Sequence, residues 1–382
     1  MDTNRIKVIE LRGSARERGE IHGEALRDQI KEVLQLWKDH FIDDYGIDFK
    51  TYYEGFHRIT DFRPALEKCT PHLIEEVEGI ATAAGVDFNE LLTLQHGNEE
   101  LWLGRRIARE IGSAVERCST IASAGDKDHP AIICHNLDWD EIFDGYQVLF
   151  RSDAQRHGTE TLLLSCAGRL SDNGINSHGV AVGDNAIYDL RPSTTGLPVF
   201  AIYRGVLECT TFDEAEHFIH SVPHASGLNW MIGAPGRVGM YEVSSGKVVP
   251  YRPNGHSQTL YHTNHALVND DFDKGFMRSK MAVINSGGQA ISRSTYLRWA
   301  SLQHRFGGLG GDITVEDIIA AVSATDDPEY PVCLGHENND AQNKLIGFTL
   351  ASCIWELKQG APTLHLASGP AATTPFRTFT FD

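Results

Sequence analysis

The hydrophobic pattern of this chain changes its period near residue 118, and this change limits the folds that the chain can adopt. Before it, apolar residues recur at helical spacing, as at Ile30, Val33 and Trp37. After it, apolar and polar residues alternate over short runs, which is the period of β-strands. We therefore predict a helical N-terminal segment over residues 1–117 and an α+β core over residues 118–382.

Capping and turn signals divide both segments into elements. Ser14 and Glu17 form a capping box, and Thr70 followed by Pro71 begins another helix. In the first segment we predict a strand over 5–12 and helices from Ser14 to Phe41, over 48–60, from Thr70 to Gly85 and from Asp87 towards Leu103. In the core we predict strands over 118–123, 131–137, 146–152, 160–166, 179–184, 228–233, 238–243 and 258–261, helices over 197–207, 211–221, 294–305 and 314–324, and a final hairpin over 347–357 and 362–368.

The composition restricts partners and compartment. The chain has 382 residues and a formal net charge of −18, a field that repels polyanions, so nucleic acid is not expected as a main partner. There is no run of about 18 apolar residues and no apolar signal-peptide core, so we expect neither a membrane span nor secretion. Seven scattered cysteines without a CxxC pair are not a disulfide framework. We expect a cytoplasmic protein.

Cys118 begins the first predicted strand of the core. Most isolated cysteines are buried structural residues, but this one follows Arg117 and precedes Ser119 and Thr120, whose hydroxyls can hold a strained peptide bond. If the Arg117–Cys118 bond is cleaved, Cys118 carries a thiol and a free α-amine with a pKa of about 7.7–8.0. Such a residue can act as nucleophile and base near neutral pH.

Four further polar residues are candidates for a site around Cys118. Asp138 ends a strand that would form a hairpin with the strand of Cys118, which would bring its carboxylate near the thiol. Asn185 and Asn264 offer neutral amide donors that can stabilise an oxyanion, although asparagine is most often a turn residue. Arg298, at a helix start, is either a solvated arginine or a charge that orients Asp138 or a substrate.

Together these motifs resemble the acyl-CoA:6-aminopenicillanic-acid acyltransferase family of self-cleaving N-terminal-nucleophile (Ntn) cysteine hydrolases, which includes Tan-type β-alanyl-amine hydrolases. The resemblance runs from about residue 5 to the C-terminus, and the order and spacing of its motifs are more specific than any one of them. The motifs are Leu11-Arg12-Gly13, Glu20–Gly23, Cys118-Ser119-Thr120, Asn136-Leu137-Asp138-Trp139, Asn176-Ser177-His178-Gly179, Gly227-Leu228-Asn229-Trp230, His262-Thr263-Asn264-His265 and Leu350-Ala351-Ser352.

The resemblance implies a fold and a catalytic set. The fold is a four-layer αββα Ntn-hydrolase sandwich, with autocatalytic cleavage between Arg117 and Cys118. Cys118 corresponds to the nucleophile and Asp138 to its orienting carboxylate. Asn264 and Asn185 correspond to the oxyanion donors.

A pocket arginine is also implied, with Arg298 as the first choice and Arg293 as the alternative. No metal and no cofactor are implied for hydrolysis, whereas coenzyme A would be the acyl donor of a transferase. The expected partners are a small-molecule amide substrate and the cleaved N-terminal fragment, which would form an α/β heterodimer with the core. A homo-oligomer is also compatible with the sequence.

Other protein classes are compatible with parts of the sequence. A papain-like enzyme would need a local nucleophile signature that is missing here. A metal hydrolase could use the helix-spaced His217, His220 and His224, or His262 and His265, although a surface helix explains the first group better. A non-enzymatic binding protein descended from the same family would have a similar sequence.

Hydrolase and acyltransferase would share the same active-site residues. The acidic charge balance and the lack of a phosphate-binding loop favour hydrolysis of a small N-acyl or peptide-like amide, with acyl-CoA-dependent N-acyl transfer as the alternative. Trp139 and Trp230 are candidate substrate-binding residues that could equally belong to the core. Glu242 could bind a substrate amine or be a solvated strand end.

Overall fold

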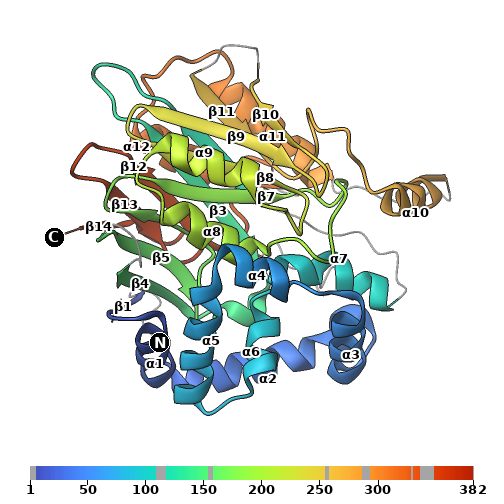
Figure 1. Ribbon diagram of the computed structural model, residues 1–382. Coiled ribbons are helices and arrows are strands. Elements are labelled where there is room, and N and C mark those ends of the chain that lie inside the picture. Colours follow the sequence, from blue (N-terminus) through green and yellow to red (C-terminus); the bar gives the residue numbers. More distant parts are fainter. Residues whose placement is uncertain are drawn as a thin grey trace.

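The protein is built around two β-sheets that face each other and carry helices on their outer sides (Figure 1). The computed structural model describes residues 6–108, 118–153, 158–253, 258–285, 293–327, 330–335 and 348–381. Strands from opposite sheets contact each other, as β2 does with β7 and β3 with β8. The apolar side chains between the sheets therefore form the main core.

Within residues 6–108, one strand precedes seven helices. Strand β1 (Lys7–Leu11) pairs parallel with β4 (Gln147–Asp153), so the first strand of the N-terminal segment belongs to the core sheet. The predicted capping box of Ser14 and Glu17 is confirmed. The helices are α1 (Ala15–Ala25), α2 (Arg27–Tyr45), α3 (Phe49–Ile59), α4 (Arg63–Cys69), α5 (Pro71–Ala84), α6 (Phe88–Leu94) and α7 (Gly97–Ala108).

The larger sheet has the strand order β1-β4-β5-β6-β7-β8-β9-β10 and is antiparallel except at β1. Its further strands are β5 (Glu160–Cys166), β6 (Asn173–Asn176), β7 (Ala181–Ala186), β8 (Leu228–Ala234), β9 (Arg237–Val243) and β10 (Val248–Tyr251). The smaller sheet is antiparallel, in the order β11-β2-β3-β12-β13-β14. It contains β2 (Ser119–Ser123), β3 (Ile132–Trp139), β11 (Thr259–His262), β12 (Phe348–Glu356), β13 (Thr363–Ala367) and β14 (Arg377–Thr380).

Helices complete a four-layer αββα arrangement. Helices α8 (Val199–Leu207) and α9 (Phe212–Ser221) contact the larger sheet, and α11 (Arg293–Phe306) and α12 (Val315–Val322) contact the smaller one. Helix α10 (Lys274–Asn285) extends to one side of the sandwich, and a short 3-10 helix covers Glu141–Phe143 (Figure 1). The predicted α+β class and the layered sandwich are confirmed.

Most predicted elements are present, and the differences have local causes. The helix expected from Asp87 towards Leu103 is two helices, α6 and α7, because the chain turns at Gln95 and His96. The helix expected from Ser14 to Phe41 is likewise interrupted at Leu26. The prediction missed α4, α10, β6, β10 and β14; β6 reads Asn-Gly-Ile-Asn, and four residues with one apolar side chain show no strand period.

A buried ion-pair network joins the N-terminal helices to the core. The Glu76 carboxylate of α5 accepts a hydrogen bond from Arg18 of α1 at 2.8 Å and two from Arg204 of α8 at 2.8 and 2.9 Å. All three side chains are at most 5% exposed. Helices α1 and α5 approach so closely that a Cβ at Gly19 would lie 2.0 Å from the Glu76 carbonyl oxygen. This contact therefore requires glycine.

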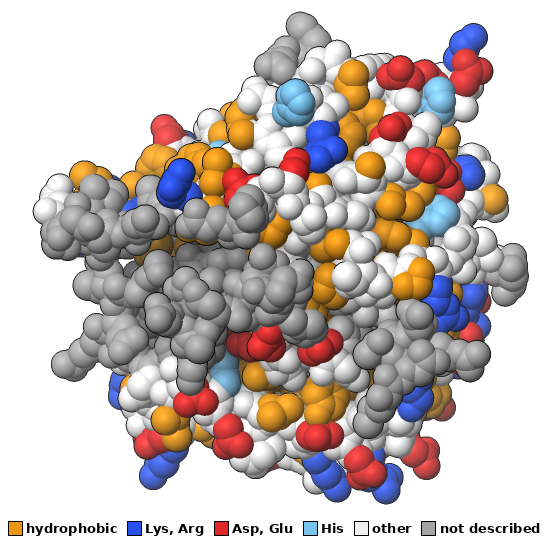
Figure 2. All heavy atoms as spheres, turned by 180° about the vertical axis from the view of Figure 1, so that it is seen from behind, with side chains coloured by type: hydrophobic (Ala, Val, Ile, Leu, Met, Phe, Trp, Pro, Cys, Tyr) orange, Lys and Arg blue, Asp and Glu red, His pale blue; other side chains and the backbone are white. Residues whose placement is uncertain are grey.

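The surface carries both signs of charge. In the coloured part of the face seen in Figure 2, acidic and basic side chains are interspersed with apolar ones. None of the helices in the described ranges has the length and apolar character needed to cross a membrane.

Candidate active site

Cys118 lies directly before β2, and the β2–β3 hairpin brings it to the end of β3. Ser119 pairs with Asn136 in the register of this hairpin, which places Leu137 opposite Cys118 and Asp138 one position further along β3. The predicted approach of Asp138 to Cys118 is therefore present. The Cys118 side chain is buried, and its Sγ lies 3.8 Å from the Asp138 backbone oxygen as a hydrogen-bond donor. Arg117 lies outside the described residues.

The Asp138 carboxylate is also buried and is oriented from a third strand. Thr349 of β12 is the register partner of Asp138, and its hydroxyl donates a hydrogen bond of 2.6 Å to Oδ1. Thr349 is 211 positions away in the chain. This contact was not predicted from the sequence, because the pattern of the final hairpin does not indicate which strand β12 pairs with.

Arg298, rather than Arg293, contacts the cysteine. Its Nη1 donates to the Cys118 carbonyl oxygen at 2.7 Å and to the Ser119 hydroxyl at 2.9 Å, and its Nη2 donates to Asn264 Oδ1 at 2.8 Å. The Arg298 side chain is fully buried, whereas Arg293 is exposed at the start of α11. One guanidinium therefore joins the backbone of Cys118 to the side chain of Asn264.

The Asn264 amide has a defined orientation. Its Oδ1 faces the guanidinium of Arg298, so its Nδ2 points the other way and donates to the Ala186 carbonyl oxygen at 3.1 Å. The backbone N–H of Asn264 donates to the Thr295 hydroxyl at 2.8 Å. The amide has a second N–H proton, so it can still donate to a ligand.

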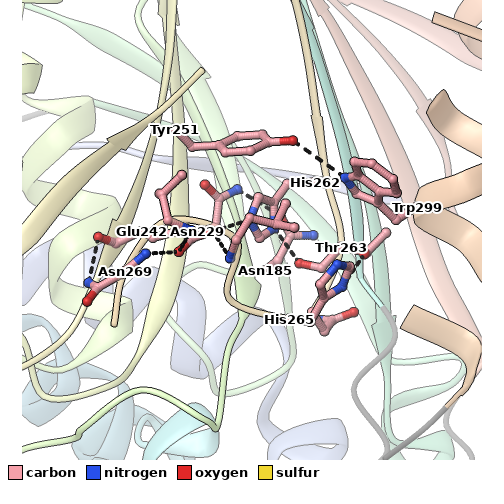
Figure 3. Close-up of polar contacts among 12 residues, drawn as sticks. Asn185, Asn229, Glu242, Tyr251, His262, Thr263, His265, Asn269 and Trp299 are labelled. Carbon is pink, nitrogen blue, oxygen red and sulfur yellow. Dashed lines mark hydrogen bonds and ion pairs between the residues drawn. The ribbon is translucent and has the colours of Figure 1, made fainter. Parts of the chain in front are cut away.

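Asn185 presents a side-chain donor that has no partner within the described ranges of the chain. Its Oδ1 accepts hydrogen bonds from the Thr120 hydroxyl at 2.6 Å and from Asn229 Nδ2 at 2.9 Å (Figure 3). This leaves the buried Nδ2 of Asn185 with no hydrogen-bond acceptor among the described residues. A buried polar atom in this state is costly unless a ligand or water satisfies it. Thr120 was noted from the sequence only as a small hydroxyl residue, and Asn229 only as part of a motif.

The surroundings of Cys118 keep its thiol protonated. Burial raises the pKa of the Cys118 thiol well above its usual range, and the negative charges of Asp184 and Asp138 raise it further; the Asp138 backbone and Arg298 oppose this. Burial also raises the Asp184 pKa to about 7, although a hydrogen bond from the Tyr203 hydroxyl lowers it. The thiol therefore needs a base to become a nucleophile.

The remaining predicted side chains have different surroundings. Trp139 is half-buried, and the Arg169 guanidinium lies 5.4 Å from its ring centroid. Trp230 is fully buried and meets Tyr203 of α8 edge to face. Glu242 is fully buried, so the solvated strand end considered for it is wrong: its carboxylate contacts His262 and three backbone N–H groups.

Two of the histidines considered for a metal site contact oxygen atoms of the protein. His262 Nε2 contacts Glu242, and His224 Nε2 contacts the Ile219 carbonyl oxygen. Across the part of the chain that the structure describes, no three His, Cys, Asp or Glu side chains gather as a metal site requires.

Comparison with known proteins gives one family and several relatives. The family model described as acyl-coenzyme A:6-aminopenicillanic acid acyl-transferase matches residues 124–369. A curated relative, the acyl-coenzyme A:6-aminopenicillanic-acid-acyltransferase 40 kDa form of Emericella nidulans, is 25% identical over 68% of this chain and 70% of its own length.

Among solved structures, a penicillin V acylase from Agrobacterium tumefaciens is 15% identical with a TM-score of 0.44, over 69% of this chain and 86% of its own. A conjugated bile acid hydrolase from Clostridium perfringens is 12% identical with a TM-score of 0.39, over 69% and 97%.

Proposed function

The chain belongs to the acyl-coenzyme A:6-aminopenicillanic acid acyl-transferase family, and on this premise we propose that it is a self-processing cysteine amidohydrolase. Its substrate is a small N-acyl or peptide-like amide, and its acyl-enzyme forms on Cys118. The observation that carries the proposal is the contact of Arg298 with the Cys118 carbonyl oxygen and with Asn264, because it supports a nucleophile and an oxyanion donor held by one group.

Self-processing removes the peptide bond before Cys118. The thiol sulfur attacks the Arg117 carbonyl carbon, the C–N bond breaks, and the thiol proton passes to the departing Cys118 amine. Water then hydrolyses the thioester, which leaves a carboxylate on Arg117 and a free thiol and α-amine on Cys118. Residues 1–117 stay bound to residues 118–382 as an α/β heterodimer, an assembly that the buried Glu76 network supports.

The new α-amine then supplies the base that the buried thiol needs. Its pKa of about 7.7–8.0 lets it take the thiol proton and later give it to the leaving amine. Asn185 and Asn264 stabilise the tetrahedral oxyanion, and each donor of this kind contributes about 3–4 kcal/mol in comparable sites. Asp138 holds the thiol and amine in the reactive orientation. Water releases the acyl group and restores Cys118.

Acyl transfer is the second candidate. The family model and the Emericella nidulans relative are both described as acyl-coenzyme A:6-aminopenicillanic acid acyltransferases. A transferase would use the same nucleophile, would take its acyl group from coenzyme A and would pass it to an amine instead of water. Hydrolysis stays our first choice because the net charge of −18 disfavours a bulky polyanionic donor.

Self-processing is tested by denaturing electrophoresis and N-terminal sequencing of the purified full chain. We expect two bands that correspond to residues 1–117 and 118–382, with Cys118 as a new N-terminus. Cys118→Ala should give one full-length band, and Cys134→Ala, which removes another buried cysteine, should process normally. Full turnover without a new terminus at position 118 would overturn the proposal.

The reaction type is tested with two probes on the processed protein. Mass spectrometry against a panel of small amides should trap an acyl adduct on Cys118, which also identifies the acyl group. Incubation with acetyl-CoA and an amine should release free coenzyme A slowly or not at all. Rapid, amine-dependent release would establish the transferase instead.

The state of the cysteines supports a proposal for the compartment. All seven are free thiols, and five of them are buried. A reducing cytoplasm keeps such thiols unoxidised, so we assign the protein there.

A further inference from the structure

Residues 263–269 connect β11 to the region before α10 and belong to neither a helix nor a strand. This connecting segment carries Asn264, which the proposed function makes an oxyanion donor. Its backbone N–H groups have no ladder or helical partner, so other groups must hold it in place. Three of the described N–H groups, those of Leu267, Val268 and Asn269, donate to a single side chain, Glu242 of β9, and the N–H of Asn264 donates to the Thr295 hydroxyl. Figure 3 shows Glu242 beside Asn269.

Glu242 and His262 form an ion-pair contact between the two sheets. Glu242 belongs to the larger sheet and His262 to β11 of the smaller one, and their Oε1 and Nε2 atoms lie 2.9 Å apart. Both side chains are fully buried. The other ring nitrogen of His262 lies 2.6 Å from the Thr263 carbonyl oxygen. Both ring nitrogens therefore lie within hydrogen-bond distance of oxygen atoms.

The same carboxylate holds the far end of the connecting segment. Leu267 N–H donates to Oε1 at 2.7 Å, and Val268 and Asn269 N–H donate to Oε2 at 3.0 and 2.8 Å. The Asn269 side chain also donates to the Glu242 backbone oxygen at 3.1 Å. The start of the segment, through His262, and its end, through three amides, are thus fixed to one group.

These donors keep Glu242 ionised inside the protein. Burial alone would raise the Glu242 pKa, but the hydrogen bond and charge of His262 and the backbone donors of Asn269 and Val268 outweigh it, so the pKa lies below its usual value. A buried ion pair is weak evidence for stability, because apolar side chains of similar volume often serve as well. A carboxylate that accepts four hydrogen bonds can fix the path of the connecting segment, whereas an apolar side chain cannot.

We propose that Glu242 is a positioning residue that acts through Asn264: with His262, it fixes the connecting segment so that the Asn264 amide stays aligned with Cys118 and Arg298. This inference rests on the proposed function. A shift of about 1 Å in a positioned group can cost about 100-fold in rate, so loosening the segment should slow acylation strongly.

The test compares Glu242→Gln with Glu76→Gln. Glutamine keeps the size of Glu242, but its amide nitrogen cannot accept the hydrogen bonds that one carboxylate oxygen receives. Glu76 is the matched control, since it is an equally buried glutamate in an ion-pair network with no contact to the connecting segment. Two readouts are needed: hydrogen–deuterium exchange of residues 263–269, and the burst of 4-nitrophenol from 4-nitrophenyl acetate, a probe that acylates an activated thiol.

In Glu242→Gln we expect residues 263–269 to exchange at least about 10-fold faster than in the wild type, and the burst rate constant to fall about 10- to 100-fold with little change in probe affinity. In the Asn264→Ala background, Glu242→Gln should lower the burst rate constant less than about twofold, because the Asn264 amide that Glu242 positions is already missing. Glu76→Gln should change neither readout. Glu242→Asp, which keeps the charge but shortens the side chain, replaces Glu242→Gln if that variant does not fold, with the same expectations.

Unchanged exchange in the segment, or an equal loss of burst rate in both backgrounds, would overturn the inference. Failure of the proposed function has a different signature, since the burst would then survive Cys118→Ala. Even in that case the exchange comparison still decides whether Glu242 fixes the segment.

Discussion

Glu76 and Asp184 are both buried carboxylates, yet their surroundings differ in charge. Glu76 anchors the N-terminal helices and faces two guanidinium groups, Arg18 and Arg204. Burial raises its pKa, but these arginines lower it more, to about 2. Asp184 lies near Cys118 and receives a hydrogen bond from the neutral Tyr203 hydroxyl. Burial dominates there, and its pKa is raised to about 7.

The comparison distinguishes the Glu76 network, which stabilises the fold, from the proposed active site around Cys118. In the Glu76 network each carboxylate oxygen of Glu76 accepts a hydrogen bond from a guanidinium group, which favours the ionised form of this carboxyl group. Around Cys118, a carboxyl group and a thiol both have raised pKa values, and the Asn185 amide offers a donor that no described residue accepts. Perturbed pKa values and unsatisfied polar atoms that cluster together are typical of functional sites. The following experiments test this separation.

The largest expected effect comes from changing the buried arginine of each region to lysine. Lysine keeps the charge but cannot reproduce the forked contacts of a guanidinium. Arg298→Lys should lower the acylation rate about 10³-fold, because it releases Cys118 and Asn264 together. Arg204→Lys should leave that rate within about threefold while lowering the thermal midpoint. Burst kinetics and thermal denaturation of both variants measure this, and an equal loss of rate in both would erase the distinction.

The second effect concerns stability. Glu76→Gln leaves Arg18 and Arg204 with one uncharged partner, so we expect it to lower the free energy of unfolding by about 3 kcal/mol at pH 7. The sign with pH follows from the depressed pKa. The stabilisation is present above the unfolded value of 4.5 and is lost as the pH falls towards about 2. Urea denaturation from pH 7 to pH 2.5 should show wild type and variant converging, and a constant gap would contradict the role given to this charge.

The sequence predicted the parts of the site that depend on local pattern. The change of period at residue 118 and the turn after it were enough to predict the β2–β3 hairpin, and with it the approach of Asp138 to Cys118. The capping box at Ser14 was equally local, since it needs only four consecutive residues.

The contacts that complete the site could not be predicted in this way, because they join distant parts of the chain. Thr349 reaches Asp138 only because β12 pairs with β3, and Arg298 reaches Cys118 only because α11 covers the smaller sheet. Neither contact can be recognised from the hydrophobic period or from the capping residues. Glu242 was misjudged for the same reason, since its donors lie 20 to 27 positions further along.

The third effect concerns the contribution of Asp184 to stability, which depends on pH in the opposite sense to that of Glu76. Because the folded pKa of Asp184 is raised from 3.8 to about 7, its contribution to stability is full below pH 3.8 and is lost as the pH rises through 7. Asp184→Asn, which remains neutral and can still accept from Tyr203, should match the wild type at pH 4 and exceed its stability by about 2 kcal/mol at pH 8. Urea denaturation at both values provides the measurement. A variant less stable than the wild type at pH 8 would show that Asp184 is a paired charge like Glu76.

The smallest expected effect links Asp184 to Cys118, the proposed nucleophile. Ionised Asp184 raises the pKa of the Cys118 thiol through its negative charge. Asp184→Asn should therefore lower that pKa and speed iodoacetamide labelling of Cys118 about 3- to 10-fold at pH 8, where the wild-type carboxyl is ionised. At pH 5.5 the carboxyl is protonated in the wild type, and the difference should shrink. Labelling is followed by mass spectrometry, with Cys69 in the same sample as the internal control because it lies in the N-terminal helices. If Cys118 is labelled at the same rate in the wild type and in Asp184→Asn, at pH 8 as well as at pH 5.5, then Asp184 does not act on the thiol. The raised pKa of the Cys118 thiol would in that case be a consequence of burial and of Asp138.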